Sequence, residues 1–152
     1  MNLDPIVTSE RGGLIAQGDA ASATGACERF DLVVFCAEEF QPHPSLLFRK
    51  NPQVRVLYAP NDDAGLTQAQ LQIATRAAEK IAVLFDDDKR ILVTCMEGRN
   101  RSGLVTALAI HLIYGIGGSR AIRIVQRRRR GARALTNPNF VDFLKRLPAA
   151  KS

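Results

Sequence analysis

The sequence predicts an α/β fold with a central, mainly parallel sheet of four or five strands and helices on both faces. Short β-branched, apolar runs alternate along the chain with longer stretches whose apolar residues recur every three or four positions. Strands and helices that alternate in this way form crossover units, and crossover units build parallel sheets. The 152 residues are about as many as one domain uses, so we expect a single domain over residues 1–152.

Short apolar runs predict the strands. They cover residues 14–18, 31–36, 54–58 and 91–95. Glycine, proline or charged residues bound these runs, which is typical of buried strands. Prolines interrupt the chain at 42 and 44, where we expect a loop.

Capping signals and apolar periodicity predict four helices. Thr67 with Gln70 three residues later forms a capping box, and the apolar residues that follow share one helix face. The other three helices are expected over residues 104–114, after Ser119, and after Asn137-Pro138, where an N-cap precedes a proline at the first helical position.

Residues 95–102, Cys-Met-Glu-Gly-Arg-Asn-Arg-Ser, lie between a predicted strand and the predicted central helix. Backbone N–H groups at the start of a helix bind anions, and Gly98 permits the turn that such a loop needs. Arg101 offers a planar fork to two phosphate oxygens. The same positive surroundings favour a thiolate at Cys95, and Ser102 can donate a hydrogen bond to it.

The pattern C-x-x-G-x-x-R-S after a strand resembles the signature of the cysteine-dependent protein tyrosine phosphatases, in particular their small dual-specificity branch. Residues 14–18 look like that family's opening strand, and residues 137–140 are similar to the start of its closing helix. The resemblance implies one phosphatase-like catalytic domain over residues 1–152. It also implies that Cys95 is the nucleophile, that Arg101 holds phosphate and that Ser102 assists the sulfur.

The resemblance also implies an aspartate that protonates the leaving group and then activates water. Asn61-Asp62-Asp63 occupies the expected place, before the helix that precedes the signature. We prefer Asp63, because the family's acid follows a short segment that contains proline, and Asp62 is the alternative. Both are also ordinary turn residues.

The loop itself supplies the candidate substrate-binding residues. They are Met96, Glu97, Gly98, Arg99, Asn100 and Arg101. The family usually has histidine directly before the nucleophile, and Thr94 stands there in this chain. Its hydroxyl can bind the loop backbone but carries no charge, so we expect weaker stabilisation of the thiolate.

The net charge of +6 favours anionic partners. Four consecutive arginines contribute to it: Arg127, Arg128, Arg129 and Arg130. They are either a solvated helix end or a contact for a polyanion such as RNA or phosphoinositide. The expected substrate is a phosphorylated protein or another phosphate monoester.

Composition excludes several classes. The three cysteines Cys27, Cys36 and Cys95 lack metal-ligand spacing, so we expect neither metal nor cofactor, and a disulfide between Cys95 and either of the others stays open. No apolar run is long enough to span a membrane, and the first residues do not resemble a signal peptide. A cytoplasmic protein is expected.

The sequence therefore predicts a phosphatase that acts on phosphotyrosine or phosphoserine/threonine through a phosphocysteine intermediate. The run Gly98–Gly103 also resembles the G-x-N-R-[ST]-G of RNA 5′-triphosphatases in the same superfamily. An RNA 5′-triphosphatase and a phosphoinositide phosphatase are the alternatives within it. An inactive phosphate-binding module is the alternative outside catalysis.

Overall fold

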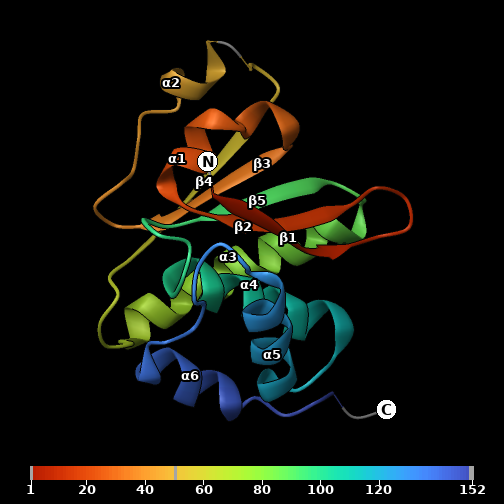
Figure 1. Cartoon of the computed structure of the whole chain (residues 1–152), viewed down its shortest axis with the longest axis vertical. Coiled ribbons are helices and arrows are strands. Elements are labelled where there is room, and N and C mark those ends of the chain that lie inside the picture. Colours follow the sequence, from red (N-terminus) through yellow and green to blue (C-terminus); the bar gives the residue numbers. More distant parts are fainter. Residues whose placement is uncertain (1, 50, 151–152) are drawn as a thin grey trace.

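A computed structural model describes residues 2–49 and 51–150. It contains one five-stranded sheet with the order β1-β2-β5-β3-β4 (Figure 1). The strands are β1 (Leu3–Thr8), β2 (Leu14–Gly18), β3 (Leu32–Ala37), β4 (Arg55–Asn61) and β5 (Arg90–Thr94). Only the β1–β2 pair is antiparallel, so the prediction of a mainly parallel sheet is confirmed.

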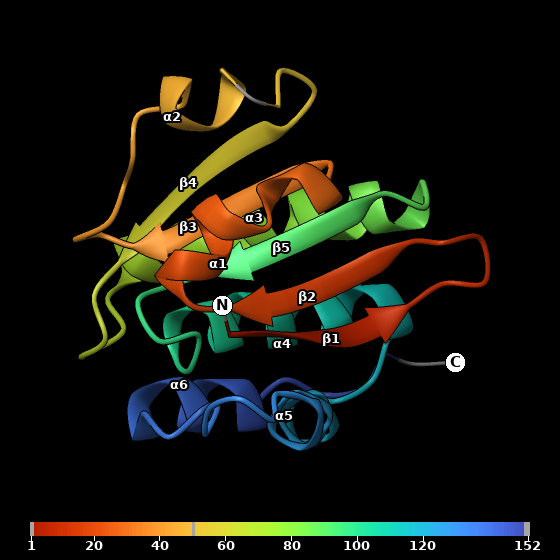
Figure 2. The same ribbon diagram turned by 45° about the horizontal axis from the view of Figure 1, so that its top comes forward.

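Helices cover both faces of the sheet, as expected (Figure 2). One face carries α1 (Ala20–Gly25), the short helix η1 (Cys27–Arg29) and α2 (Ser45–Phe48). The other face carries α3 (Gln68–Asp86), α4 (Arg101–Tyr114), α5 (Gly118–Arg128) and α6 (Pro138–Lys145). Each face has its own hydrophobic core, because successive side chains of a strand point to opposite faces.

The predicted capping signals act as expected. Thr67 accepts the backbone N–H of Gln70 at 3.2 Å, and the Gln70 side chain accepts the backbone N–H of Thr67 at 2.9 Å. Asn137 caps α6 through the N–H of Asn139 at 2.9 Å, with Pro138 in the first turn. These local bonds fix where α3 and α6 begin.

Strand β1 and the short helices α1, η1 and α2 were absent from the sequence-based expectation. Strand β1 contains Asp4 and Pro5 and lies at the sheet edge, where proline is tolerated because its nitrogen owes no ladder hydrogen bond. Helices α1 and α2 are short, with six and four residues. Segments this short give too little apolar periodicity to predict a helix.

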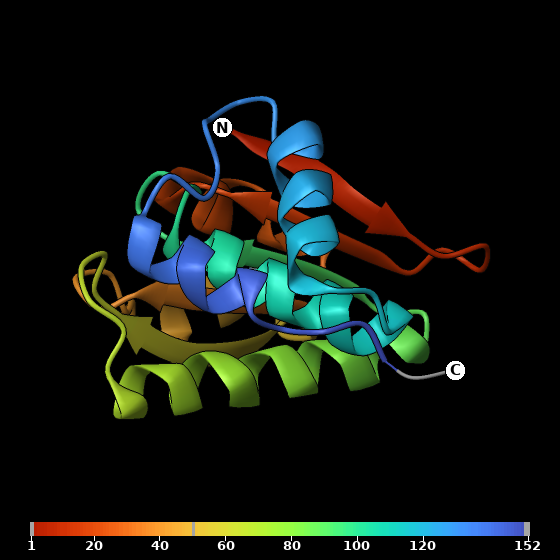
Figure 3. The same cartoon turned by 90° about the horizontal axis from the view of Figure 1, so that it is seen from below.

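Parallel pairing brings the ends of three strands together. Gly18 of β2 and Phe35 of β3 both lie opposite Thr94 of β5. The chain then leaves β5 and enters α4, which is buried from Arg101 to Ile110 and runs back along the sheet between α3 and α5 (Figure 3). A site between β5 and α4 therefore lies at the carboxyl edge of the parallel strands, where α/β folds bind ligands.

Among the described residues, no helix combines the length and the apolar character that crossing a membrane requires.

Candidate active site

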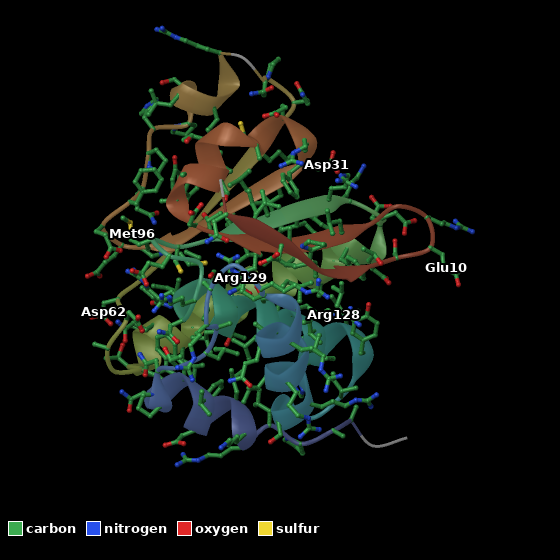
Figure 4. The ribbon with its side chains drawn as sticks, in the orientation of Figure 1. Glu10, Asp31, Asp62, Met96, Arg128 and Arg129 are labelled. Atoms are coloured by element: carbon green, nitrogen blue, oxygen red, sulfur yellow. The ribbon has the colours of Figure 1, made fainter. Side chains whose placement is uncertain are left out.

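The predicted loop encloses a cavity of about 260 Å³ at the carboxyl edge of the sheet. Its lining residues are Glu39, Asp63, Cys95, Met96, Glu97, Arg99, Asn100 and Arg101. Figure 4 shows Met96 and Asp62 on this side of the molecule, opposite the β1–β2 hairpin that carries Glu10. The fold thus brings the residues of the 95–101 loop together with Asp63, which is more than thirty positions away in the sequence.

Cys95 lies at the start of the loop and is 4% exposed. Its Sγ lies 3.2 Å from the Oγ of Ser102, which is fully buried in the first turn of α4. A hydroxyl at this distance can donate to a thiolate and stabilise it. Sequence reasoning predicted this pair.

The Arg101 guanidinium is buried and held along one edge. Its Nη1 donates to the carboxylate of Glu39 and to the carbonyl oxygen of Asn61 at 3.1 Å. Its Nε and Nη2 donate to none of the residues that the structure describes. That pair is a planar fork whose geometry can match two oxygens of a phosphoryl group.

Glu39 is a member of the site that sequence reasoning missed. It follows β3, and the hydrogen bond from Arg101 holds the pKa of its carboxyl below the usual value of 4.5. Burial lowers the pKa of Arg101, but the Glu39 contact and nearby negative charges outweigh this, so the net change is upward. No local pattern in the sequence separates Glu39 from its neighbour Glu38, because both stand in a loop.

The backbone of the loop turns at Gly98, where φ is +68°. The carbonyl oxygen of Gly98 accepts from Gln17 Nε2 at 3.0 Å and from Arg129 Nε at 2.9 Å. Arg129 Nη2 also donates to the carbonyl oxygen of Glu97 at 3.1 Å. The C=O and N–H of a trans peptide point in opposite directions. Because Gln17 and Arg129 bind the Gly98 and Glu97 carbonyls on the side away from the cavity, the amide N–H groups that follow these carbonyls are turned toward the cavity.

Arg129 corrects the expectation of a four-arginine surface. Its side chain is fully buried between the sheet and the helices (Figure 4), where its Nη1 meets Asp4 at 2.7 Å and the side chain of Asn2 at 2.7 Å. A signal existed in the sequence: Ile122, Val125 and Arg129 follow helical spacing, so Arg129 continues the apolar stripe of α5 toward the core. Arg127, Arg128 and Arg130 are exposed, although Arg128 also donates to the Ile6 carbonyl at 2.7 Å.

The carboxylate of Asp63 is held by two carboxamides at the cavity. Asn100 Nδ2 donates to Asp63 Oδ2 at 3.0 Å, and Asn137 Nδ2 donates to Asp63 Oδ1 at 2.8 Å. Asp62 instead accepts from Gln70 Nε2 at 2.7 Å and does not line the cavity. The geometry thus separates the two aspartates that the sequence left as alternatives.

Other predicted loop residues lie at the rim. Glu97 and Arg99 form an exposed ion pair at 3.1 Å, and Met96 is 41% exposed. An exposed pair of this kind contributes little stability, so both side chains are free to rearrange around a ligand.

The other two cysteines lie in the hydrophobic cores on opposite faces of the sheet. Cys36 on β3 is fully buried, and its pKa is raised by burial and by the neighbouring charge of Cys95. Cys27 lies in η1 within the core on the opposite face of the sheet. All three thiols are free in this structure.

Solved structures share this arrangement of the whole chain. Tk-PTP in its active form matches with a TM-score of 0.72 and 23% identity, over 93% of this chain and 94% of that chain. Human DUSP28 matches with a TM-score of 0.69 and 25% identity, over 95% and 91%. The chain belongs to the superfamily of cysteine-dependent protein tyrosine and dual-specificity phosphatases.

A third structure of the superfamily, PTPMT1 in complex with PI(5)P, matches with a TM-score of 0.69 and 17% identity, over 94% and 92% of the two chains. No protein-family model matches the sequence, and a search of curated proteins finds no match. The likeness to the superfamily is therefore carried by the fold.

Thr94 is where this chain departs from the usual superfamily pattern of histidine before the nucleophile. Its Oγ1 donates to the Val34 carbonyl of β3 at 2.8 Å, within the buried sheet. The hydroxyl thus bonds to a neighbouring strand and not to the loop backbone, which its chemistry would also have allowed. The hydrogen bonds that support the loop backbone come instead from the side chains of Gln17 and Arg129.

Proposed function

We propose that this chain, over residues 1–152, is a phosphatase domain that hydrolyses phosphate monoesters of proteins through a phosphocysteine at Cys95. The proposed substrates are phosphotyrosine and phosphoserine/threonine. One observation carries the proposal: Cys95, Arg101 and Asp63 line one cavity, and the buried Ser102 hydroxyl lies 3.2 Å from the Cys95 sulfur. A nucleophile, a phosphate clamp and a proton donor together are what phosphoryl transfer to a side chain requires.

In the first step, Cys95 Sγ attacks phosphorus and the bond from phosphorus to the ester oxygen breaks. Asp63 gives its proton to that oxygen, so the product leaves as an alcohol or phenol. The Arg101 fork and the amides of residues 96–101 hold the phosphoryl oxygens, where negative charge is spread in the transition state.

In the second step, water attacks phosphorus and the S–P bond breaks. The Asp63 carboxylate takes a proton from the water, inorganic phosphate leaves, and the thiolate of Cys95 is restored. Ser102 donates to the departing sulfur, which its distance of 3.2 Å favours. No metal or organic cofactor enters either step, and a reducing setting such as the cytoplasm keeps Cys95 a thiol.

Phosphate release from an aryl phosphate tests the proposal, with wild type compared with Cys95→Ser and Asp63→Asn. We expect chelator-resistant release that Cys95→Ser abolishes and Asp63→Asn lowers by about 10²–10⁴-fold. A stable ³²P-labelled adduct on Cys95 should form with Asp63→Asn. Turnover that survives in Cys95→Ser would overturn the mechanism.

Substrate class is tested by comparing phosphopeptides, RNA 5′-triphosphates and phosphoinositides, the last being the class of ligand bound in the PTPMT1 structure. We expect phosphopeptides to be hydrolysed fastest. Faster release from RNA or lipid would favour the corresponding alternative. Phosphate binding without any turnover would favour an inactive binding module.

The exposed arginines around α5 support a polyanion contact as part of the same proposal. Residues 115–135 contain no acidic residue, and Arg120, Arg123, Arg127, Arg130 and Arg133 are exposed. Arg129 is excluded from this surface because it is buried. Such a surface attracts RNA or an acidic lipid headgroup over a range set by ionic strength.

A further inference from the structure

We propose that Asn100 is a positioning residue that holds the general acid Asp63 in register with the 95–101 loop before substrate arrives. The inference rests on the proposed phosphatase function and extends it to a side chain that takes no part in the chemical steps. Asn100 directly precedes Arg101, so the phosphate clamp and the support of the acid lie on adjacent residues. One short segment therefore sets the distance between the phosphoryl group and its proton donor.

The carboxamide of Asn100 uses its full hydrogen-bonding capacity. Its Nδ2 donates to Asp63 Oδ2 at 3.0 Å and to Thr136 Oγ1 at 3.2 Å. Its Oδ1 accepts from the backbone N–H groups of Thr136 at 2.7 Å and Asn137 at 2.9 Å. Two donors and two acceptor lone pairs are all that an asparagine side chain has, so its orientation is fixed.

The position of Asn100 directly before α4 makes this use unusual. Asparagine at that position ordinarily accepts a backbone N–H of the first turn. Asn100 makes no side-chain capping bond, although the residue is only 7% exposed. The side chain is thus committed to the neighbouring segments and not to its own helix.

A second carboxamide closes the arrangement into a ring. Asn137 Nδ2 donates to Asp63 Oδ1 at 2.8 Å and to the Ala64 carbonyl at 3.0 Å, while its backbone N–H donates to Asn100 Oδ1. Each oxygen of Asp63 therefore accepts from one asparagine, and the two asparagines are themselves linked by the bond from the Asn137 backbone N–H to Asn100 Oδ1. Because Asn137 also caps α6, the ring ties the 95–101 loop, the segment after β4 and the start of α6 together.

This geometry predicts a dependence on the leaving group. A misplaced acid matters most when the leaving oxygen needs a proton, as with phenyl phosphate. It matters least when the leaving group is already stable as an anion, as with 4-nitrophenyl phosphate. A residue that only stabilises the loop would affect both substrates alike, since both use the same phosphate clamp.

Asn100→Asp is the informative variant. Its oxygen can still accept from Thr136 and Asn137, but the donor to Asp63 is replaced by a carboxylate oxygen. We expect kcat/KM, which reports the first step and not the shared hydrolysis of the phosphocysteine, to fall at least tenfold more for phenyl phosphate than for 4-nitrophenyl phosphate, with a fall of about 10²-fold for phenyl phosphate. Asn100→Ser, which also lacks the amide donor, carries the same test if the aspartate variant does not fold.

Asn139→Ala is the matched control. Asn139 donates to the Ala64 carbonyl at 3.0 Å from an exposed position and makes no bond to Asp63. It should leave the ratio of the two kcat/KM values unchanged. Thermal unfolding of each variant measures any general loss of structure.

A double-mutant cycle with Asp63→Asn decides whether Asn100 acts through the acid. We expect Asn100→Asp to cause no further loss of kcat/KM in the Asp63→Asn background. An additive loss there, or an equal loss for both substrates, would overturn the positioning role while the phosphatase proposal stands. A folded, reduced wild type that releases no phosphate from either substrate would overturn both proposals.

Discussion

The Arg129 guanidinium and the Gly98 carbonyl form a 2.9 Å hydrogen bond on the side of the loop that faces away from the cavity. The positive charge lies near Asp4 at 2.7 Å and is covered by the first strand. A surface cation would neutralise a bound phosphate directly. Arg129 instead acts on the carbonyls of the loop, and its effect on phosphate passes through the amides that these carbonyls orient.

Replacing Arg129 with methionine should destabilise the protein. The change keeps much of the side-chain volume but leaves Asp4 and the Gly98 carbonyl without their donor, so we expect the free energy of unfolding to fall by about 3 kcal/mol. Urea denaturation measures this. Arg127→Met, at an exposed position of the same tract, should change it by less than about 0.5 kcal/mol. Equal losses of unfolding free energy in the two variants would contradict a structural role for the buried contacts of Arg129 with Asp4 and the Gly98 carbonyl.

The Asp4–Arg129 pair should also make stability depend on pH. Partial burial raises the pKa of Asp4, but hydrogen bonds from the Gly131 amide and from Arg129 outweigh it, so the net pKa lies below the usual 3.8. The stabilisation is therefore complete above pH 3.8 and is lost as the pH falls through the lower folded pKa. Asp4→Asn should be less stable than wild type at pH 7, and the gap should narrow in acid. With Arg129→Met as the background, we expect a smaller gap at pH 7.

Gly98→Ala should abolish turnover. A Cβ at Gly98 would lie 2.6 Å from Arg129 Nη2 and from the Gly18 carbonyl, and φ is +68°, where a side chain is strained. Gly12→Ala separates backbone strain from steric overlap, because Gly12 has a φ of +98° but open space around it. That variant should lose about 1–2 kcal/mol of stability and keep its kcat. Normal activity in Gly98→Ala would show that the loop tolerates a shifted backbone.

Arg101→Lys should lower kcat/KM for an aryl phosphate by about 10²–10³-fold. Lysine keeps the charge but lacks the Nε–Nη2 fork. Its single ammonium group cannot bind Glu39 and two phosphoryl oxygens in the planar geometry that arginine provides. Arg120→Lys, on the exposed face of α5, is the control and should match wild type. A small loss in Arg101→Lys would mean that charge alone, without the fork, accounts for binding.

The basic surface of α5 is tested by changing Arg127, Arg130 and Arg133 together to glutamine. We expect weaker binding to a 5′-triphosphate oligonucleotide and to phosphoinositide vesicles, with the slope of the salt dependence reduced by about one unit for each arginine that no longer meets a phosphate. Aryl phosphate turnover should not change, because these residues lie outside the cavity. Unchanged binding to both polyanions would remove the polyanion contact from the proposal.

The sequence predicted those parts of the fold that depend on local chemistry. The capping box at Thr67, the N-cap at Asn137 and the apolar strands follow from neighbouring residues, and the structure contains each of them. The loop residues from Cys95 to Ser102 are contiguous, so their proximity needed no knowledge of tertiary structure. Strand β1 could not be predicted in this way, because its pairing with β2 is decided by the rest of the sheet.

The supports of the loop are long-range contacts. Glu39 and Gln17 come from segments that are more than fifty residues before the loop, and nothing in their local sequence differs from an ordinary surface or strand residue. The Thr94 side chain lies in the core because its hydroxyl donates to the Val34 carbonyl of the neighbouring strand β3. Arg129 was the one residue supporting the loop whose burial the local sequence indicated, because it lies four residues after the apolar Val125. It was overlooked because it stands in a run of four arginines, which suggested a charged surface.

The contacts behind the loop join segments that are far apart in the sequence. Arg129 and Asp4 are 125 positions apart, yet the orientation of the Gly98 and Glu97 carbonyls depends on their meeting. During synthesis, the strand that carries Asp4 leaves the ribosome well before Arg129. The Gly98 carbonyl can therefore gain its second donor, beside Gln17, only after Arg129 has been made.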